Sequence, residues 1–235
     1  MLIRDGAPVV RVAMTPDALT DLELLARWRA GDHAMGSALY RRYAPAITSF
    51  FRRNARDRAD VEELAQETFI ALRRSNSAVE NVSAYLFQIA KFKLIGYIRK
   101  FSGLPDLMDE AADLEQVGGE FVPEPEYIQA QREDTRLLLR AIRRLPLKHQ
   151  LVIELSFWAE KTGPEIAEIL AIPVGTVASR LRQAKACLVD KLRELADSHE
   201  ALRATTTTVD QWRIRLRELL AQQSTDESSL DEASS

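Results

Sequence analysis

The sequence predicts an all-α protein, and three observations support this class. Apolar residues recur at intervals of three and four through nearly every segment of the 235-residue chain, as on the buried faces of helices. Alternating runs of β-branched residues, which are typical of strands, do not occur, and turn dipeptides are sparse. The hydrophobic content of 46 % is that of an ordinary soluble globular protein. We therefore expect two helical domains joined by a flexible acidic linker, followed by a C-terminal helical extension.

The first helical domain is expected over residues 20–101, after an N-terminal leader at 1–19. Side chains suited to helix N-caps divide it into helices. Pro45 is expected to end one helix and begin the next, because proline lacks the amide hydrogen that a helix interior uses. The expected helices are 21–30 with the capping box Thr20 and Glu23, 33–43 capped by Asp32, 45–53, 58–74 capped by Asp57, and 83–100 begun by Ser83.

Residues 102–129 are expected to form a linker. The segment contains Gly118-Gly119 and three prolines, and its apolar content is too low for it to pack alone. Residues 1–101 carry a net charge of +5, residues 102–134 carry −9, residues 135–200 carry +3 and the remainder −2. Two mildly basic blocks flank an acidic connector, so the overall charge of −3 does not exclude nucleic-acid binding.

The second helical domain is expected over residues 130–200, with helices at about 126–144, 148–159, 164–170 and 174–196. The last two form a helix-turn-helix pattern, and Thr162 with Glu165 makes a capping box at its start. On the last helix one face is apolar and the opposite face is polar or small: Val177, Leu181, Ala184 and Leu188 against Ala178, Ser179, Arg182, Gln183 and Ala186, with Arg180 and Lys185 on the flanks. The unit fits a DNA major groove, but a plain helical hairpin with a solvated face fits the pattern as well.

Several chemistries are excluded by what the chain contains. The single cysteine, Cys187, rules out an internal disulfide and a thiolate metal cluster, and we expect it to be a buried structural thiol. The three histidines form no metal-ligand spacing, and no nucleophile, base and acid cluster is present. We expect no metal, no cofactor and no enzymatic activity. No apolar stretch reaches the roughly 18 residues of a membrane span, so we expect a cytoplasmic protein.

Motifs in both domains resemble those of one protein family. In the second domain they are Leu145-Pro146, Glu165-Ile166-Ala167, Gly175-Thr176-Val177 and Ser179-Arg180-Leu181; in the first they are the runs DVEELAQETF over 60–69 and YLFQIA over 85–90. The former look like region 4, and the latter like region 2, of bacterial extracytoplasmic-function (ECF) sigma factors. A helix-turn-helix of this type alone also occurs in response regulators, whereas the pair of modules in this order is specific.

The resemblance implies a subunit that binds core RNA polymerase through its β and β′ subunits and directs it to promoter DNA, with an anti-sigma factor as a further partner. It implies polymerase binding by the outward face of helix 58–74, at Glu62, Glu63, Gln66, Glu67 and Ile70. It implies contacts to the −35 element by Thr176, Ala178, Ser179, Arg180, Arg182, Gln183 and Lys185. For the −10 element, where the family captures a flipped base with loop 75–82 and the helix after it, it implies Asn76, Asn81, Tyr85, Lys91, Lys93, Arg99 and Lys100.

Some features remain open at this level. Phe92 and Gly96 stand where the family usually has an asparagine and an aspartate, which leaves the details of −10 reading unsettled. The acidic linker is either a solvated tether or a mimic of nucleic acid along a basic channel of the polymerase. The extension at 201–235 is expected to hold one amphipathic helix, about Val209 to Gln222, and a disordered tail. The alternative function is a stand-alone DNA-binding regulator, which co-purification with core polymerase would distinguish.

Overall fold

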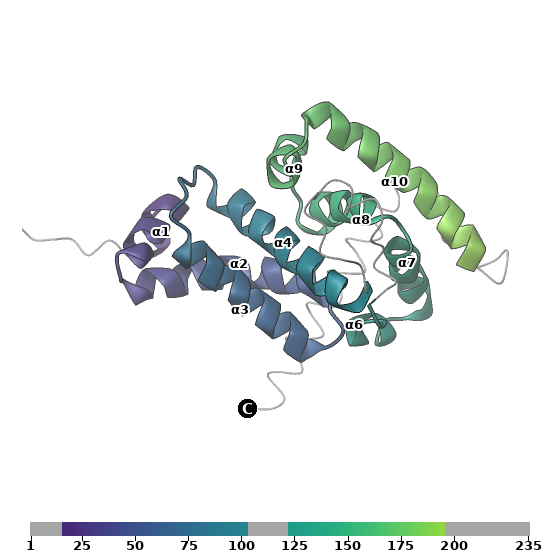
Figure 1. The fold of residues 1–235 in the computed structure, drawn as a ribbon, viewed down its shortest axis with the longest axis horizontal. Helices are drawn as coiled ribbons and strands as arrows, with labels where there is room; N and C mark the ends of the chain where they lie inside the picture. The colour runs from purple at the N-terminus through teal and green to yellow at the C-terminus, as the bar shows by residue number, and fades with distance from the viewer. Residues whose placement is uncertain (1–15, 103–121, 196–235) are drawn as a thin grey trace, which may run out of the picture.

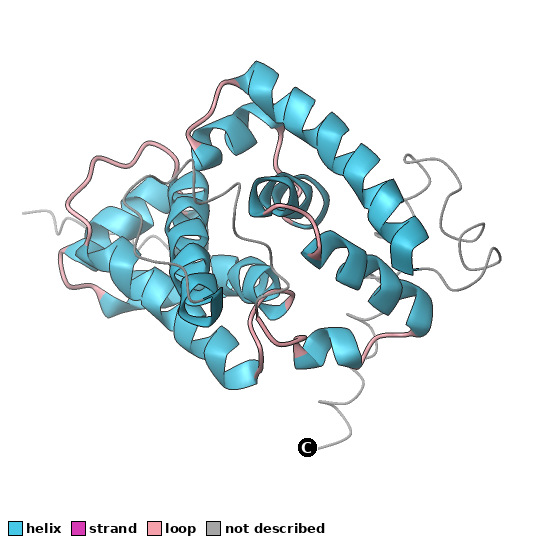
Figure 2. Ribbon diagram, turned by 45° about the vertical axis from the view of Figure 1, so that its right-hand side comes forward, coloured by secondary structure: helices cyan, strands magenta, loops and turns pink. Residues whose placement is uncertain are grey.

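The structure is a computed structural model, and it describes residues 16–102 and 122–195. In these ranges every regular element is a helix (Figure 2), which confirms the all-α class. The elements are η1 (Pro16–Ala18), α1 (Asp21–Arg29), α2 (His33–Arg52), α3 (Arg58–Arg74), α4 (Val82–Ser102), α6 (Glu126–Gln129), α7 (Glu133–Arg143), α8 (Leu147–Ile153), η3 (Glu154–Trp158), α9 (Gly163–Leu170) and α10 (Val174–Leu195). The leader to residue 15, the linker residues 103–121 and the expected helix over Val209 to Gln222 lie outside the described residues.

Helices α1 to α4 form one bundle, called here the N-terminal bundle, and α7 to α10 with η3 form the C-terminal bundle (Figure 1). Aromatic side chains fill the centre of the N-terminal bundle. The Phe50 ring meets those of Phe51 and Phe87 edge-on, at centroid distances of 5.3 and 5.9 Å. All three rings are buried, and each fully buried side chain of this size contributes roughly 1.5–3 kcal/mol.

Helix starts agree with the capping residues read from the sequence, with one exception. Thr20 and Glu23 form the predicted capping box at α1, and Asp32 and Asp57 cap α2 and α3. The exception is α4, where the Asn81 side chain accepts the Ala84 amide at 3.0 Å and the helix begins at Val82. The helix therefore begins one residue before the predicted Ser83.

Helix α2 runs without interruption through Pro45, so the predicted division into two helices is wrong. Leu39 on one side of the proline and Ile47, Phe50 and Phe51 on the other are all buried in the same core. A proline inside a helix costs about 3 kcal/mol, which the burial of three large side chains beyond it outweighs.

The segment predicted as one helix over 126–144 is two helices, α6 and α7, separated at residues 130–132. Helix α6 belongs with the N-terminal bundle at its start, because the Glu126 amide donates to the Arg56 carbonyl at 3.0 Å. Val122 and Ile128 are buried. The last residues of the segment predicted as linker are thus folded.

The C-terminal bundle contains the predicted helix-turn-helix. Thr162 and Glu165 form the predicted capping box at α9, and Ala171 ends this helix in the left-handed region at φ 55°. The predicted helix 148–159 is shorter: α8 passes into the π-helical turn η3 at Glu154. No helix in the described ranges is long and apolar enough to cross a membrane.

Candidate nucleic-acid and protein interfaces

The polar face of α10 points away from both bundles. Val177, Ala184 and Leu188 are buried as predicted, while Leu181 is half-buried. Of the residues expected to contact the −35 element, Ala178, Arg182 and Gln183 are exposed, whereas Thr176, Ser179, Arg180 and Lys185 are half-buried. A helix that exposes an arginine and a glutamine at adjacent positions presents the side chains that most often read base edges in the major groove.

Two of these residues also have contacts inside the protein. The Ser179 hydroxyl donates to the Thr176 carbonyl at 2.9 Å, so it is partly engaged by its own helix. The Lys185 ammonium lies 6.0 Å from the centroid of the Phe157 ring in η3. The ring holds this cation at the flank of the helix, where a phosphate contact is expected.

A second candidate surface lies on α3. Its buried stripe lies opposite the face expected to bind polymerase and consists of Val61, Leu64, Ala65, Thr68, Phe69 and Leu72. It leaves Glu62, Glu63, Gln66 and Ile70 exposed, and Ile70 keeps 48 % of its surface in contact with solvent. Sequence reasoning missed Tyr40 of α2, which is 46 % exposed and whose ring lies 4.9 Å from that of Phe69.

Glu67 and Lys93 join the α3 surface to α4. The Lys93 ammonium donates to the Glu67 carboxylate at 2.8 Å, and both side chains are partly exposed. One residue predicted to bind polymerase is therefore paired with one predicted to bind DNA. Helix spacing along one helix gives no signal for this pair, because its members lie on different helices.

The loop between α3 and α4, residues 75–81, is held by Arg29 of α1. This guanidinium donates to the Ser77 carbonyl at 3.3 Å and to the Leu72 carbonyl at 3.2 Å. The Leu72 carbonyl belongs to the last turn of α3, where carbonyls lack helical partners. Arg29 thus fixes both the end of α3 and the path of the loop, a role that no sequence motif indicates.

Tyr85 also holds this loop. Its hydroxyl forms a 2.7 Å hydrogen bond with the Ser75 hydroxyl, which lowers the pKa of Tyr85. Its ring is half-buried, and Asn81 is the cap of α4. Of the residues expected to contact the −10 element, Asn76 is exposed on the loop, while Tyr85 and Asn81 also form structural hydrogen bonds.

Helix α4 is more deeply buried than the sequence interpretation assumed. Five of its residues are expected to contact DNA, but Phe87, Leu94 and Tyr97 of the same helix lie in the core. The Tyr97 hydroxyl donates to Asp60 at 2.6 Å, and burial raises its pKa. The helix is covered on one side by α3 and on another by α9, which sequence periodicity cannot reveal.

The cations of α4 differ in their exposure. Lys91 is only 3 % exposed, and its ammonium lies 4.3 Å from the centroid of the Phe92 ring. Lys100 is exposed and Arg99 is half-buried. Phe92, which replaces the usual asparagine, is 50 % exposed and is thus the accessible aromatic platform of this helix.

Comparison with known proteins identifies both bundles. The family model for sigma-70 region 2 matches residues 39–102, and that for sigma-70 region 4 matches residues 135–188. The ECF RNA polymerase sigma-E factor of Haemophilus influenzae is 29 % identical over 189 residues, covering 76 % of this chain and 98 % of the relative. The Escherichia coli K12 sigma-E factor is 29 % identical over 187 residues, covering 76 % and 97 %.

The chain belongs to the ECF sigma factors of the sigma-70 family. It directs promoter recognition for transcription initiation. A further relative, the ECF sigma factor RpoE of Cereibacter sphaeroides, is 28 % identical over 167 residues, covering 69 % of this chain and 87 % of the relative. The solved structure of CnrH in complex with the cytosolic domain of CnrY shares the fold, with a TM-score of 0.55 at 22 % identity over 76 % of this chain and 99 % of that one. The presence of region 2 in front of region 4 speaks against a stand-alone regulator.

Within the described residues, no group of three or more His, Cys, Asp or Glu side chains is arranged to hold a metal ion. Cys187, predicted to be buried, is half-buried and packs at the edge of the hydrophobic core.

Proposed function

We propose that this sigma factor reads the −35 element with the exposed face of α10. The single observation that carries the proposal is the exposure of Arg182 and Gln183 on a helix whose opposite face is buried. Arg182 and Gln183 contact base edges, and Thr176, Ala178, Ser179 and Arg180 line the same approach. Lys185 contacts a phosphate, which contributes affinity but no sequence information.

The N-terminal bundle has two functions in this proposal. Its α3 face, with exposed Ile70 beside carboxylates, docks on the β′ subunit of core polymerase. An apolar residue within a polar rim is the usual composition of a protein interface. The loop 75–81 captures one base of the −10 element, and Phe92, about 15 Å further along α4 at 1.5 Å per residue, stacks on another base, with Arg99 and Lys100 near the phosphates.

The chain contributes binding energy to strand separation and performs no covalent chemistry. It acts in the cytoplasm, because that is where polymerase transcribes. An anti-sigma factor is proposed as a further partner. The supporting observation is that CnrH, which shares the fold, is solved with the cytosolic domain of CnrY bound. The acidic linker is proposed to pass along a basic channel of the polymerase.

Reconstituted transcription tests the proposal. Core polymerase with the full chain is used to transcribe genomic DNA, the promoters are read from the transcripts, and binding to one cognate −35 element is then compared among variants. Arg182→Ala and Gln183→Ala are each expected to cost about 1–3 kcal/mol on the cognate element and to relax specificity there. Lys185→Ala is expected to weaken binding evenly across sequences and to reduce its salt dependence.

The matched control is Arg193→Ala, because Arg193 lies on the same helix, is exposed and forms a surface ion pair with Asp190. It should bind the cognate element as the unaltered chain does. An Arg182→Ala protein that keeps both affinity and sequence preference would show that α10 reads DNA through other residues.

A further inference from the structure

The two bundles contact each other directly, through α4 on one side and α9 on the other. The Gln88 side-chain amide donates to the Glu168 carbonyl at 2.9 Å, and the Lys161 ammonium donates to the Ser83 hydroxyl at 2.7 Å. The same ammonium lies 5.4 Å from the centroid of the Phe87 ring. Each of these contacts joins a residue of the N-terminal bundle to one of the C-terminal bundle.

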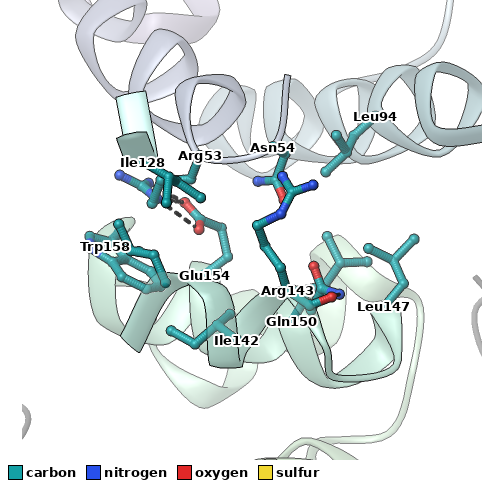
Figure 3. Close-up of a pocket in the computed structure, with 12 residues that line it drawn as sticks. Arg53, Asn54, Leu94, Ile128, Ile142, Arg143, Leu147, Gln150, Glu154 and Trp158 are labelled. Atoms are coloured by element: carbon teal, nitrogen blue, oxygen red, sulfur yellow. Dashed lines mark hydrogen bonds and ion pairs between the residues drawn. The ribbon is translucent and has the colours of Figure 1, made fainter. Parts of the chain in front are cut away.

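A second contact between the bundles is a buried ion pair between Arg53, at the end of α2, and Glu154 of η3 (Figure 3). The Arg53 Nε donates to both carboxylate oxygens of Glu154, at 3.1 and 2.9 Å, and an Nη donates to one of them as well. The guanidinium also lies 4.6 Å from the Trp158 ring centroid. The two residues are 5 % and 6 % exposed. The cavity beside them has a volume of about 20 Å³, room for about one water molecule, so the bundles are closely packed here.

This arrangement does not allow both promoter elements to be read at once. Elements centred near −35 and −10 are about 25 base pairs apart, or about 85 Å at 3.4 Å per base pair. Packed helices are separated by 8–10 Å, and α9 lies directly on α4 while α10 lies on α9, so α10 is within roughly 20 Å of α4. In addition, Lys91 of α4, expected to contact DNA, is almost fully covered. The bundles must separate before the chain can bind a promoter.

We propose that the Arg53–Glu154 pair is the latch of a closed, autoinhibited state of the free sigma factor, and that core polymerase binds the chain in an open state in which this pair is broken. The inference rests on the proposed function in one respect: the bundles need to separate because the chain binds polymerase and promoter DNA. The closed state itself is a property of the free chain and is tested without polymerase or DNA.

A buried ion pair suits a latch because its partners depend on each other. Both charges lose hydration free energy on closure. Their mutual attraction compensates for this loss only when the full set of hydrogen bonds between them forms. Burial raises the pKa of Glu154, and the adjacent Arg53 opposes that rise. If one partner is removed, the other remains as a buried charge without its counter-ion. If both are replaced by apolar side chains of similar volume, closure is unchanged or favoured.

This dependence predicts opposite effects for single and double variants. Arg53→Met should shift the ratio of open to closed molecules toward the open state by about 100-fold or more, which corresponds to roughly 3 kcal/mol at 1.4 kcal/mol per tenfold. Arg53→Met with Glu154→Met should return the population to the closed state. A role in bundle stability alone does not predict such a reversal of inter-bundle distance.

Energy transfer between two dyes measures the distance in the full chain. The dyes are attached to Ala26→Cys on α1 and Ala186→Cys on α10, both exposed positions, in a Cys187→Ala background. The labelled chain with Arg53 and Glu154 intact should show mainly high energy transfer, and the Arg53→Met variant should show mainly low energy transfer. The double variant should show high energy transfer again. Arg27→Met, an exposed arginine on α1, is the control and should leave transfer unchanged. Circular dichroism of each variant shows whether both bundles remain helical.

The outcomes separate the latch from the proposed function. A fully helical Arg53→Met protein with unchanged transfer overturns the latch, and so does a double variant that stays as open as the single one. Addition of core polymerase should convert high transfer to low transfer in the unaltered chain and should require less polymerase for Arg53→Met. If polymerase binds without a change in transfer, opening is not coupled to binding. If polymerase does not bind at all, the proposed function fails while the transfer measurements on the free chain still decide the latch.

Discussion

Glu67→Lys tests the polymerase-docking face of α3, and the structure shows how to separate an effect on the interface from an effect on the fold. Glu67 accepts from Lys93 at 2.8 Å, with both side chains partly exposed. A surface pair of this kind contributes about 0.2–1 kcal/mol. The substitution removes that contribution and places two like charges together, which costs a similar amount. We therefore expect a loss of about 1 kcal/mol in stability and an intact helical fold.

The effect on polymerase binding should be larger than the effect on stability. Reversing a charge at a complementary interface leaves a repelled group in contact with the partner, so the Kd for core polymerase should rise at least tenfold, or about 1.4 kcal/mol. Binding is measured in the absence of DNA, by fluorescence anisotropy of labelled sigma titrated with core polymerase. Thermal unfolding of the same proteins gives the stability.

The double variant Glu67→Lys with Lys93→Glu isolates the interface. It restores an ion pair of reversed polarity, so stability should return to near that of the unaltered chain. Polymerase binding should remain weak, because residue 67 still presents a cation. Recovery of polymerase binding in the double variant would mean that the single variant failed through repulsion between α3 and α4, and the interface assignment would be refuted.

Three other predictions concern the 75–81 loop and the capping box of α9. Arg29→Ala should leave core binding intact but reduce promoter opening, because loop 75–81 loses its anchor, and permanganate reactivity of −10 thymines measures this; full reactivity would show that the loop needs no anchor. Thr162→Ala should destabilise the C-terminal bundle by about 1 kcal/mol through loss of the α9 cap, as followed by urea unfolding, and an unchanged midpoint would contradict the cap assignment. Hydrogen bonds from Thr162 lower the pKa of Glu165. The stability that this carboxylate contributes is therefore present above its unfolded pKa of about 4.3 and is lost as pH falls through the lower folded pKa. Glu165→Gln should flatten the pH dependence of the free energy of unfolding in that acid range.

Local features of this fold could be predicted from the sequence because their causes lie within a few residues. Both capping boxes, the Asp32 and Asp57 caps and the six-residue buried stripe of α3 depend on residues two to four positions apart. The exposure of Arg182 and Gln183 follows from the same helical periodicity. Capped helix starts and buried helix faces are therefore the features that the sequence predicts best.

The features that were missed depend on contacts between distant segments. Pro45 stays inside α2 because residues on both sides of it share a core, and Lys91 is buried on a helix that packs against both α3 and α9. The contacts of Arg29 with Ser77 of the 75–81 loop and of Arg53 with Glu154 span 48 and 101 positions in the chain. A single sequence holds no periodic signal for such pairs.

The inter-bundle ion pair has a consequence for building chimeric regulators. Exchanging one DNA-reading module for that of another sigma factor is attractive because the two modules read separate promoter elements. In this chain, however, a grafted C-terminal module without a carboxylate at the position of Glu154 would leave the buried Arg53 guanidinium without its counter-ion whenever the modules met. Such a hybrid would differ from its parents in its resting state as well as in its promoter preference. Arg53 and Glu154 must therefore be transferred, or replaced, as a unit.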